Sequence, residues 1–98
     1  MGLTIVKCGG AASELSPEAT ILPLYAEGES VCVVHGAGPQ ISEEMVRRGL
    51  EVRFVKGRRY TSPEALEVVR DSFTAVNARL VAALGDCATG LMGDEAGL

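Results

Sequence analysis

Apolar residues form short runs and helix-spaced stripes along the chain, separated by glycine-rich turns. Residues 3–7 and 31–35 are short, β-branched apolar runs that end in glycine, and both predict buried strands. The unbroken apolar character of residues 31–35 is typical of a parallel strand covered on both faces. Residues 51–55 alternate polar and apolar side chains, which predicts a half-exposed strand, and residues 56–60 predict a hairpin or lid at the surface. Residues 87–92 predict one further strand.

Two shorter helices are predicted between these strands. Ser16 and Pro17 favour a helix start, with the serine as N-cap. Pro23 is expected to break the hydrogen bonding of this helix, which should therefore be short or irregular and end at Gly28. The second helix is predicted over residues 39–48, with Gly49 as its C-terminal stop.

The strongest helix signal covers residues 61–84. A Thr61–x–x–Glu64 capping box overlaps a Ser62–Pro63 entry. The apolar face predicted for this helix consists of Leu66, Val69, Phe73, Val76, Leu80 and Leu84. Strands alternating with helices imply βαβ units, so the fold class is α/β: a mostly parallel sheet with helices on both faces and a surface β-hairpin.

Composition narrows the class of protein. The 98 residues are 47% hydrophobic and carry a formal net charge of −4, which suits one small globular domain without a basic face for nucleic acid. The N-terminal residues lack the charged and long apolar regions of a signal peptide, so none is expected, and no apolar run approaches the ~20 residues that span a bilayer. The three cysteines form no Cys-x-x-Cys pair, so reduced thiols and a cytoplasmic location are expected. With one histidine, no metal site is expected.

Two predicted strands lead into glycine turns, which we name the first glycine turn (residues 8–10) and the second glycine turn (residues 36–38). Ligands of open parallel sheets bind beyond the carboxyl ends of the strands, where backbone N–H groups and a helix N-terminus favour anions. Lys7 adds the positive charge that phosphoryl transfer needs. The alternative is that the glycines only turn the chain and Lys7 only caps a strand, since neither Walker A nor Gly-x-Gly-x-x-Gly is present.

Other polar residues have weaker signals. Arg58 and Arg59 lie on the predicted hairpin, where a planar guanidinium suits a carboxylate, although paired arginines are also typical of a solvated loop tip. His35 ends a buried strand and is expected to be a hydrogen-bonded core residue rather than a base. Cys8 lacks a second catalytic partner and is not expected to act as a nucleophile.

Together these segments resemble the N-terminal part of N-acetylglutamate kinases, of the amino acid kinase family. The resemblance is collinear and covers nearly the whole chain, through residues 5–10, 33–41, 54–61, 64–69, 76–77, 80–81 and 90–93. It implies a partial three-layer α/β/α amino acid kinase fold. Residues 1–98 would be the part of the kinase domain that binds the amino-acid substrate, without the nucleotide-binding C-terminal half.

The function that the resemblance implies is ATP-dependent phosphorylation of the side-chain carboxylate of N-acetyl-L-glutamate to an acyl phosphate, in arginine biosynthesis, with ATP and Mg²⁺ required. Carried over by position, Lys7 would be the catalytic residue that stabilises the transferring phosphoryl group. Gly9 and Gly10 would donate N–H groups to phosphate. Gly36 and Ala37 would hold the amino-acid substrate.

The resemblance also assigns the substrate-binding arginine to Arg59 rather than Arg58, and a homo-oligomer interface to the helix at residues 61–84. Three departures from the family pattern stand out. Ala37 replaces a glycine, residues 94–96 replace a Lys-Asp-Gly sequence, and the segment from residue 10 to residue 31 is short and carries Pro23.

Because the nucleotide-binding half has no counterpart, the chain is expected to be truncated and largely inactive alone. Two alternatives stay open. One is a non-catalytic substrate-binding or dimerisation module built on the same half-domain. The other is a kinase for a carrier-linked aminoadipate or glutamate.

Overall fold

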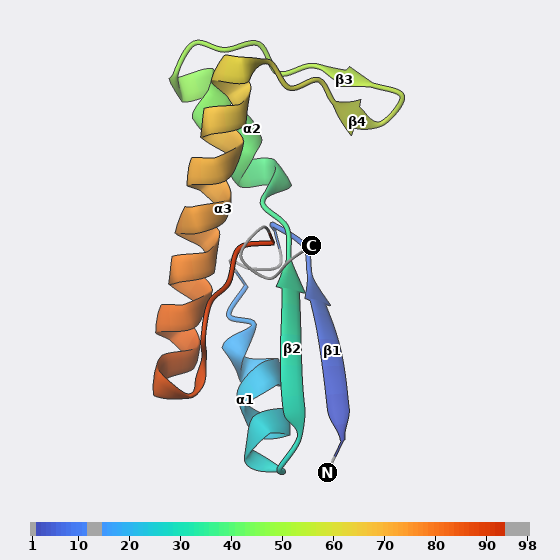
Figure 1. Ribbon diagram of the computed structural model, residues 1–98, viewed down its shortest axis with the longest axis vertical. Coiled ribbons are helices and arrows are strands. Elements are labelled where there is room, and N and C mark those ends of the chain that lie inside the picture. Colours follow the sequence, from blue (N-terminus) through green and yellow to red (C-terminus); the bar gives the residue numbers. More distant parts are fainter. Residues whose placement is uncertain (1, 12–14, 94–98) are drawn as a thin grey trace.

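Two parallel strands form the lower part of the protein. In this computed structural model, which describes residues 2–11 and 15–93, β1 (Leu3–Cys8) pairs with β2 (Ser30–His35). The register runs from Leu3 opposite Ser30 to Cys8 opposite His35. Both predicted strands are therefore confirmed, and their carboxyl ends lie at the same edge of the sheet (Figure 1).

Helix α1 (Glu18–Ala26) connects the two strands and continues through Pro23. The predicted side-chain cap at Ser16 is wrong, because the N-cap is Pro17 and no side chain caps this helix. Ser16 instead has a φ of 55° and contributes its carbonyl oxygen to the first turn. Pro23 removes only the hydrogen bond that its own missing N–H would donate, and the helix stays short but unbroken up to the turn at Gly28.

Helix α2 (Gly38–Arg47) starts inside the second glycine turn and confirms the predicted helix to within one residue at each end. Ile41 and Met45 lie four residues apart and are both buried, because that spacing places them on one face. Gly49 follows the helix with a φ of 76°, a conformation that glycine adopts without steric cost, so the predicted stop is confirmed.

The predicted hairpin is present and small. Strands β3 (Phe54–Val55) and β4 (Arg58–Arg59) pair antiparallel, joined by Lys56 and Gly57, which both have positive φ. The predicted strand over residues 51–55 is therefore limited to its last two residues. A hydrogen bond of 2.8 Å from the Tyr60 N–H to the Arg53 carbonyl continues the pairing toward the body of the protein.

Helix α3 (Pro63–Leu84) is the long helix that the sequence predicts. The Ser62 hydroxyl caps it by accepting a hydrogen bond of 3.1 Å from the Ala65 N–H, so the Ser–Pro entry is confirmed. The overlapping Thr61 capping box is wrong, because Thr61 lies one residue before the cap and its hydroxyl donates to the Arg59 carbonyl at 3.4 Å.

The segment that follows α3 differs from its prediction. Residues 87–92 do not form a strand: the chain passes through the short 3₁₀ helix η2 (Gly85–Cys87) and then runs back alongside α3 toward the carboxyl end of β2 (Figure 1). The Leu91 carbonyl accepts a hydrogen bond from the Asn77 side chain at 3.2 Å. At this carbonyl the backbone therefore bonds to a helix side chain rather than to a neighbouring strand. The family departure at residues 94–96 lies outside the described residues.

The core lies mainly between α2 and α3. It comprises Ala37, Ile41, Met45, Ala65, Val68, Val76 and Leu80. The buried face of α3 is rotated from the predicted one, since Leu66 is 52% exposed whereas Val68 is completely buried. Spacing alone identifies an apolar stripe, but the position of α2 decides which edge of that stripe is covered.

The sheet is covered on one face among the described residues. Leu3 and Ile5 of β1 and Val34 of β2 are each more than half exposed, whereas the alternate residues of both strands are more covered. The expectation that β2 is covered on both faces therefore holds for one face in the described part of the chain. No helix in that part combines the length and the apolar character that crossing a membrane requires.

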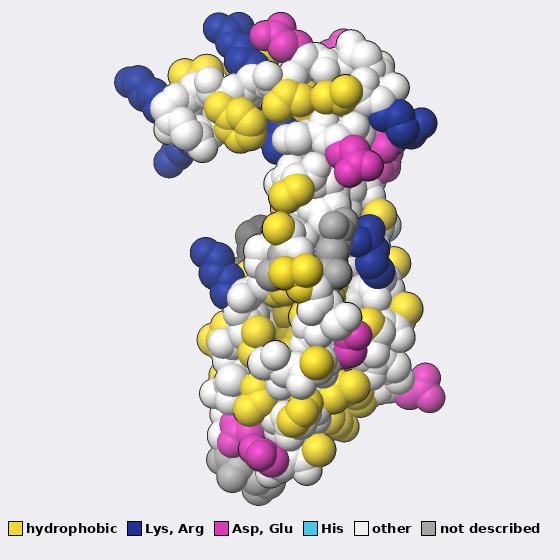
Figure 2. All heavy atoms as spheres, turned by 180° about the vertical axis from the view of Figure 1, so that it is seen from behind, with side chains coloured by type: hydrophobic (Ala, Val, Ile, Leu, Met, Phe, Trp, Pro, Cys, Tyr) yellow, Lys and Arg dark blue, Asp and Glu magenta, His cyan; other side chains and the backbone are white. Residues whose placement is uncertain are grey.

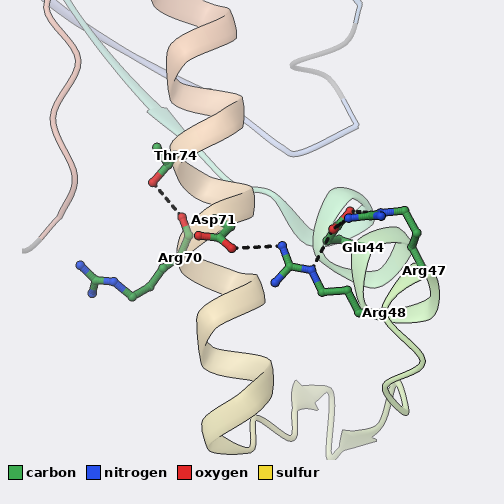
Figure 3. A network of polar contacts seen from close by, with 6 residues as sticks. All are labelled: Glu44, Arg47, Arg48, Arg70, Asp71 and Thr74. Atoms are coloured by element: carbon green, nitrogen blue, oxygen red, sulfur yellow. Dashed lines mark hydrogen bonds and ion pairs between the residues drawn. The ribbon is translucent and has the colours of Figure 1, made fainter.

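A surface network of charges joins α2 to α3 (Figure 3). Arg47 and Arg48 both donate to the Glu44 carboxylate, the latter from Nε at 2.9 Å, and Arg48 Nη2 also reaches Asp71 Oδ2 at 3.1 Å. The hydrogen bond from Arg47, followed by that from Arg48, lowers the pKa of Glu44 from 4.5 to about 2. The network therefore depends on an ionised Glu44.

Glu44→Gln is expected to reduce the loss of stability in acid. Because the folded-state pKa of Glu44 is depressed, its ionised form stabilises the fold fully above about pH 4.5, and this contribution is lost as the pH falls toward about 2. Urea unfolding at about pH 7 and about pH 3 should show a smaller difference for Glu44→Gln than for wild type. Glu43→Gln, whose carboxylate forms no ion pair within the described residues, is the matched control. Equal pH dependence in wild type and Glu44→Gln would contradict this account.

Candidate functional site

The two glycine turns lie side by side, as the parallel arrangement predicts. The Gly36 N–H donates to the Cys8 carbonyl at 3.1 Å and extends the pairing of the strands into the turns. From the first turn of α2, Gln40 Nε2 donates to the Gly10 carbonyl at 2.7 Å. A backbone hydrogen bond thus holds the first glycine turn to the residue after β2, and a side-chain hydrogen bond holds it to the first turn of α2.

The two residues of the Gly9–Gly10 pair have different surroundings. A Cβ atom at Gly9 would meet nothing within 4 Å, so its backbone faces open space. A Cβ atom at Gly10 would lie 2.6 Å from Gln40 Oε1, 2.8 Å from Pro39 Cδ and 2.9 Å from the Gly38 nitrogen. Gly10 is therefore required for the close contact between the turns, whereas the space at Gly9 fits the approach of a ligand.

Gly10→Ala is expected to destabilise the protein by about 1–3 kcal/mol, because the added methyl group overlaps backbone as well as side-chain atoms. Gly9→Ala is the matched control and should change stability by less than about 1 kcal/mol, since it meets no neighbour. Thermal unfolding of both variants measures the difference. Equal melting temperatures for the two variants would show that the turns are not packed as described.

Ala37 fits its position without strain. Its φ is −151°, so this member of the second glycine turn does not need the left-handed conformation that favours glycine. Its methyl group is buried in the core, where it packs with α2 and α3. The residue is also the N-cap of α2, so the positive end of that helix dipole lies at the turn.

Arg59 reaches from the hairpin to the start of α2. Its Nη2 donates to the Gly38 carbonyl and to Ser42 Oγ, each at 3.0 Å, and Nη1 contacts Met45 Sδ at 3.6 Å. The guanidinium carbon also lies 4.8 Å from the centre of the Phe54 ring, a cation–π distance. The guanidinium is thereby fixed beside the second glycine turn, and it carries more N–H donors than these contacts use.

Lys7 and Arg58, the other two basic residues singled out from the sequence, are placed differently from Arg59. Lys7 is exposed near the carboxyl end of β1, one residue before the buried Cys8, and forms no ion pair or hydrogen bond with the described residues. Arg58 is exposed on β4 and makes none of the contacts of its neighbour Arg59. Of the two hairpin arginines, the structure therefore connects only Arg59 to the second glycine turn.

His35 is the hydrogen-bonded residue that its strand position predicts. Its Nε2 lies 3.2 Å from Asn77 Nδ2, and its ring packs against Phe73 with the ring centres 6.1 Å apart. The histidine is half-buried.

The candidate site is an exposed edge of the sheet with the hairpin projecting above it, rather than a closed pocket. Figure 2 shows the hairpin projecting over a hollow beside the body of the protein, with hydrophobic and basic side chains toward its tip. A cavity of about 370 Å³ lies between α2 and α3, and one of about 200 Å³ lies beneath the base of the hairpin. Neither is lined by Lys7, Gly9 or Arg59.

Three residues that contact the site were not identified from the sequence as functional. Gln40 and Ser42 follow the second glycine turn on α2, and Asn77 is an amide in the middle of an otherwise apolar helix face. Asn77 carried a usable signal, because a polar residue within an apolar stripe needs a hydrogen-bond partner. Gln40 and Ser42 carried none, since helices commonly expose such residues.

Comparison with known proteins identifies the family of the chain. A family model described as the amino acid kinase family matches residues 2–88. The chain belongs to the amino acid kinase family. It is 42% identical to the acetylglutamate kinase of Geobacillus sp. (strain WCH70) over 104 residues, which cover 98% of this chain and 40% of that protein. It is also 42% identical to the acetylglutamate kinase of Corynebacterium diphtheriae, over 98% of this chain and 34% of that protein.

These relatives confirm the predicted resemblance to N-acetylglutamate kinases, and the chain spans 40% or less of their length. The same fold occurs in N-acetylglutamate synthase from Neisseria gonorrhoeae, solved in complex with coenzyme A and N-acetyl-glutamate. That structure superposes with a TM-score of 0.68 at 20% identity, over 92% of this chain and 22% of the other. This amino acid kinase family member is therefore α/β, as predicted.

Proposed function

We propose that the chain supplies the acceptor-binding part of an ATP-dependent kinase for N-acetyl-L-glutamate, in arginine biosynthesis. In this reaction a side-chain carboxylate oxygen of the substrate attacks the terminal phosphorus of ATP. A new P–O bond forms, the bond to the bridging oxygen breaks, and ADP leaves together with its electron pair. The names of the relatives support the reaction. The observation that supports the site is the hydrogen bond from Arg59 to the Gly38 carbonyl, which holds the guanidinium beside the second glycine turn.

Arg59 is assigned to bind a carboxylate of N-acetyl-L-glutamate. Its contacts with Gly38, Ser42 and Phe54 fix the plane of the guanidinium before a ligand arrives, so less conformational entropy is lost on binding. The dipole of α2 adds positive potential at the same place. Of the second glycine turn, Gly36 already uses its N–H in the strand pairing, and Ala37 is the residue that the resemblance assigns to hold substrate through its N–H.

Lys7 and the first glycine turn are assigned to the phosphoryl group. Lys7 is exposed and has no anionic partner among the described residues, so its charge is available to an incoming phosphate. Gly9 faces open space, which fits the close approach of phosphate oxygens to its N–H. Gly10, in this proposal a second donor, also fixes the turn against α2.

The reaction also needs ATP and, by resemblance, Mg²⁺. Within the described residues no group of three or more His, Cys, Asp or Glu side chains lies together, and no step proposed here runs through a metal ion. Most of the length of the relatives lies outside this chain, and we assign nucleotide binding to a part of the kinase beyond residues 1–98. Homo-oligomerisation through α3 and a cytoplasmic location stay predictions.

The binding assignment is tested by thermal unfolding of the chain with added ligands. At about ten times Kd, N-acetyl-L-glutamate should raise Tm by on the order of 5–10 °C. N-acetyl-L-glutamine is the matched ligand, because it has the same shape without the side-chain carboxylate, and it should raise Tm much less. ATP alone should have no comparable effect. No shift with N-acetyl-L-glutamate, or an equal shift with ATP alone, would refute the assignment.

A further inference from the structure

Asn77 lies in the middle of α3 and contacts two other segments of the chain. Its Nδ2 atom is 3.2 Å from His35 Nε2 and 3.2 Å from the Leu91 carbonyl oxygen. His35 Nδ1 in turn lies 3.3 Å from the Gly36 carbonyl oxygen. The contacts connect the segment after α3, drawn in red in Figure 1, to the second glycine turn at the end of β2.

The direction of each hydrogen bond follows from Leu91, whose carbonyl oxygen can only accept. Asn77 must therefore present its NH₂ group to the Leu91 oxygen, since the Asn77 side-chain oxygen and the Leu91 oxygen would repel each other. The second hydrogen of the same NH₂ group faces His35 Nε2, which must then be the nitrogen with the lone pair. In the neutral imidazole the proton is consequently on Nδ1, where it donates to the Gly36 carbonyl.

We propose that Asn77 and His35 are positioning residues for the second glycine turn: Asn77 selects the Nδ1–H form of His35, which holds the Gly36 carbonyl. Because the peptide group is planar and trans, fixing this carbonyl also fixes the opposite direction of the Ala37 N–H. That N–H is the one assigned to the substrate, so the proposal rests on the proposed function for its ligand. The direct observation behind it is the set of contacts from Gly36 to Leu91.

Gly90 allows the segment after α3 to approach Asn77. A Cβ atom at this position would overlap Asn77 Oδ1 and would lie 2.8 Å from Val81 Cγ2. Gly90→Ala should therefore push the Asn77 amide away from His35 without changing either polar side chain. It provides a second, independent way to disturb the connection.

The tautomer of His35 in the wild-type chain is the first test. Nitrogen-15 NMR at about pH 8 distinguishes a protonated from an unprotonated imidazole nitrogen, and the chain has a single histidine, so the signals are unambiguous. We expect Nδ1 to be protonated and Nε2 to be unprotonated. The opposite tautomer in the folded protein would overturn the proposal, and the measurement requires neither a variant nor a ligand.

Asn77→Asp is the second test, because its carboxylate only accepts hydrogen bonds. The proton of His35 should move to Nε2, the amide resonance of Ala37 should shift, and N-acetyl-L-glutamate should bind about tenfold more weakly. Thr74→Ala is the control on the same helix: it removes a hydroxyl that, among the described residues, bonds only to the Arg70 carbonyl, and it should leave the tautomer unchanged.

An unchanged tautomer in folded Asn77→Asp would overturn the proposal. If circular dichroism shows that Asn77→Asp does not fold, Gly90→Ala decides in its place: a population of the Nε2–H form supports the proposal, and an unchanged tautomer overturns it. If wild type keeps the Nδ1–H form but binds no N-acetyl-L-glutamate, the proposed function fails while the tautomer result stands. The two failures are therefore distinguishable.

Discussion

Arg59→Ala is expected to weaken binding of N-acetyl-L-glutamate by about 10- to 100-fold, which corresponds to the loss of charge-assisted hydrogen bonds worth about 1.5–3 kcal/mol. Arg58→Ala removes the same charge one residue away, where the side chain is exposed and does not contact α2, and should change Kd by less than about twofold. Isothermal titration calorimetry of both variants measures the difference.

Arg59→Lys separates the charge of Arg59 from its geometry. Lysine keeps the positive charge but cannot bond Gly38 and Ser42 through a planar fork, so its affinity should lie between those of wild type and Arg59→Ala. Equal Kd values for Arg58→Ala and Arg59→Ala would mean that net charge, rather than the position of this guanidinium, determines binding.

Met45→Ala is expected to destabilise the protein by about 2–5 kcal/mol, because Met45 is 1% exposed in the core between α2 and α3. Val46→Ala is the neighbouring control: Val46 is 68% exposed, so its truncation should cost less than about 1 kcal/mol. Urea unfolding of the two variants gives both values.

Met45→Leu tests whether packing or the sulfur contact with Arg59 dominates at this position. The substitution roughly conserves volume and should cost less than about 1.5 kcal/mol, since most of the stabilisation comes from packing. A loss as large as that of Met45→Ala would show that the contact with Arg59 Nη1, rather than burial, stabilises this part of the core.

The strands and helices that local signals specify could be predicted from the sequence. The β-branched run before Gly36, the Ser62–Pro63 entry and the Gly49 stop each act within a few residues, and each is found where it was expected. Parallel pairing then brings the two glycine turns together, because it places both carboxyl ends at one edge.

Features that depend on a distant partner could not be predicted in the same way. The rotation of the α3 face, which exposes Leu66 and buries Val68, is decided by the position of α2. Residues 87–92 were expected to form a strand, but the Leu91 carbonyl of this segment bonds to the Asn77 side chain. The partners of Arg59 on α2 depend on how the hairpin folds back, and no local pattern encodes that.

A chimeric enzyme tests the central claim most directly, that this chain supplies the acceptor-binding part of a kinase for N-acetyl-L-glutamate. Residues 1–98 replace the matching segment of the Geobacillus sp. (strain WCH70) acetylglutamate kinase, and acyl phosphate is trapped with hydroxylamine. We predict ATP-dependent hydroxamate formation with N-acetyl-L-glutamate and its near-complete loss on Arg59→Ala. A folded chimera that still binds ATP but forms no hydroxamate, or one equally active with Arg59→Ala, would contradict the claim.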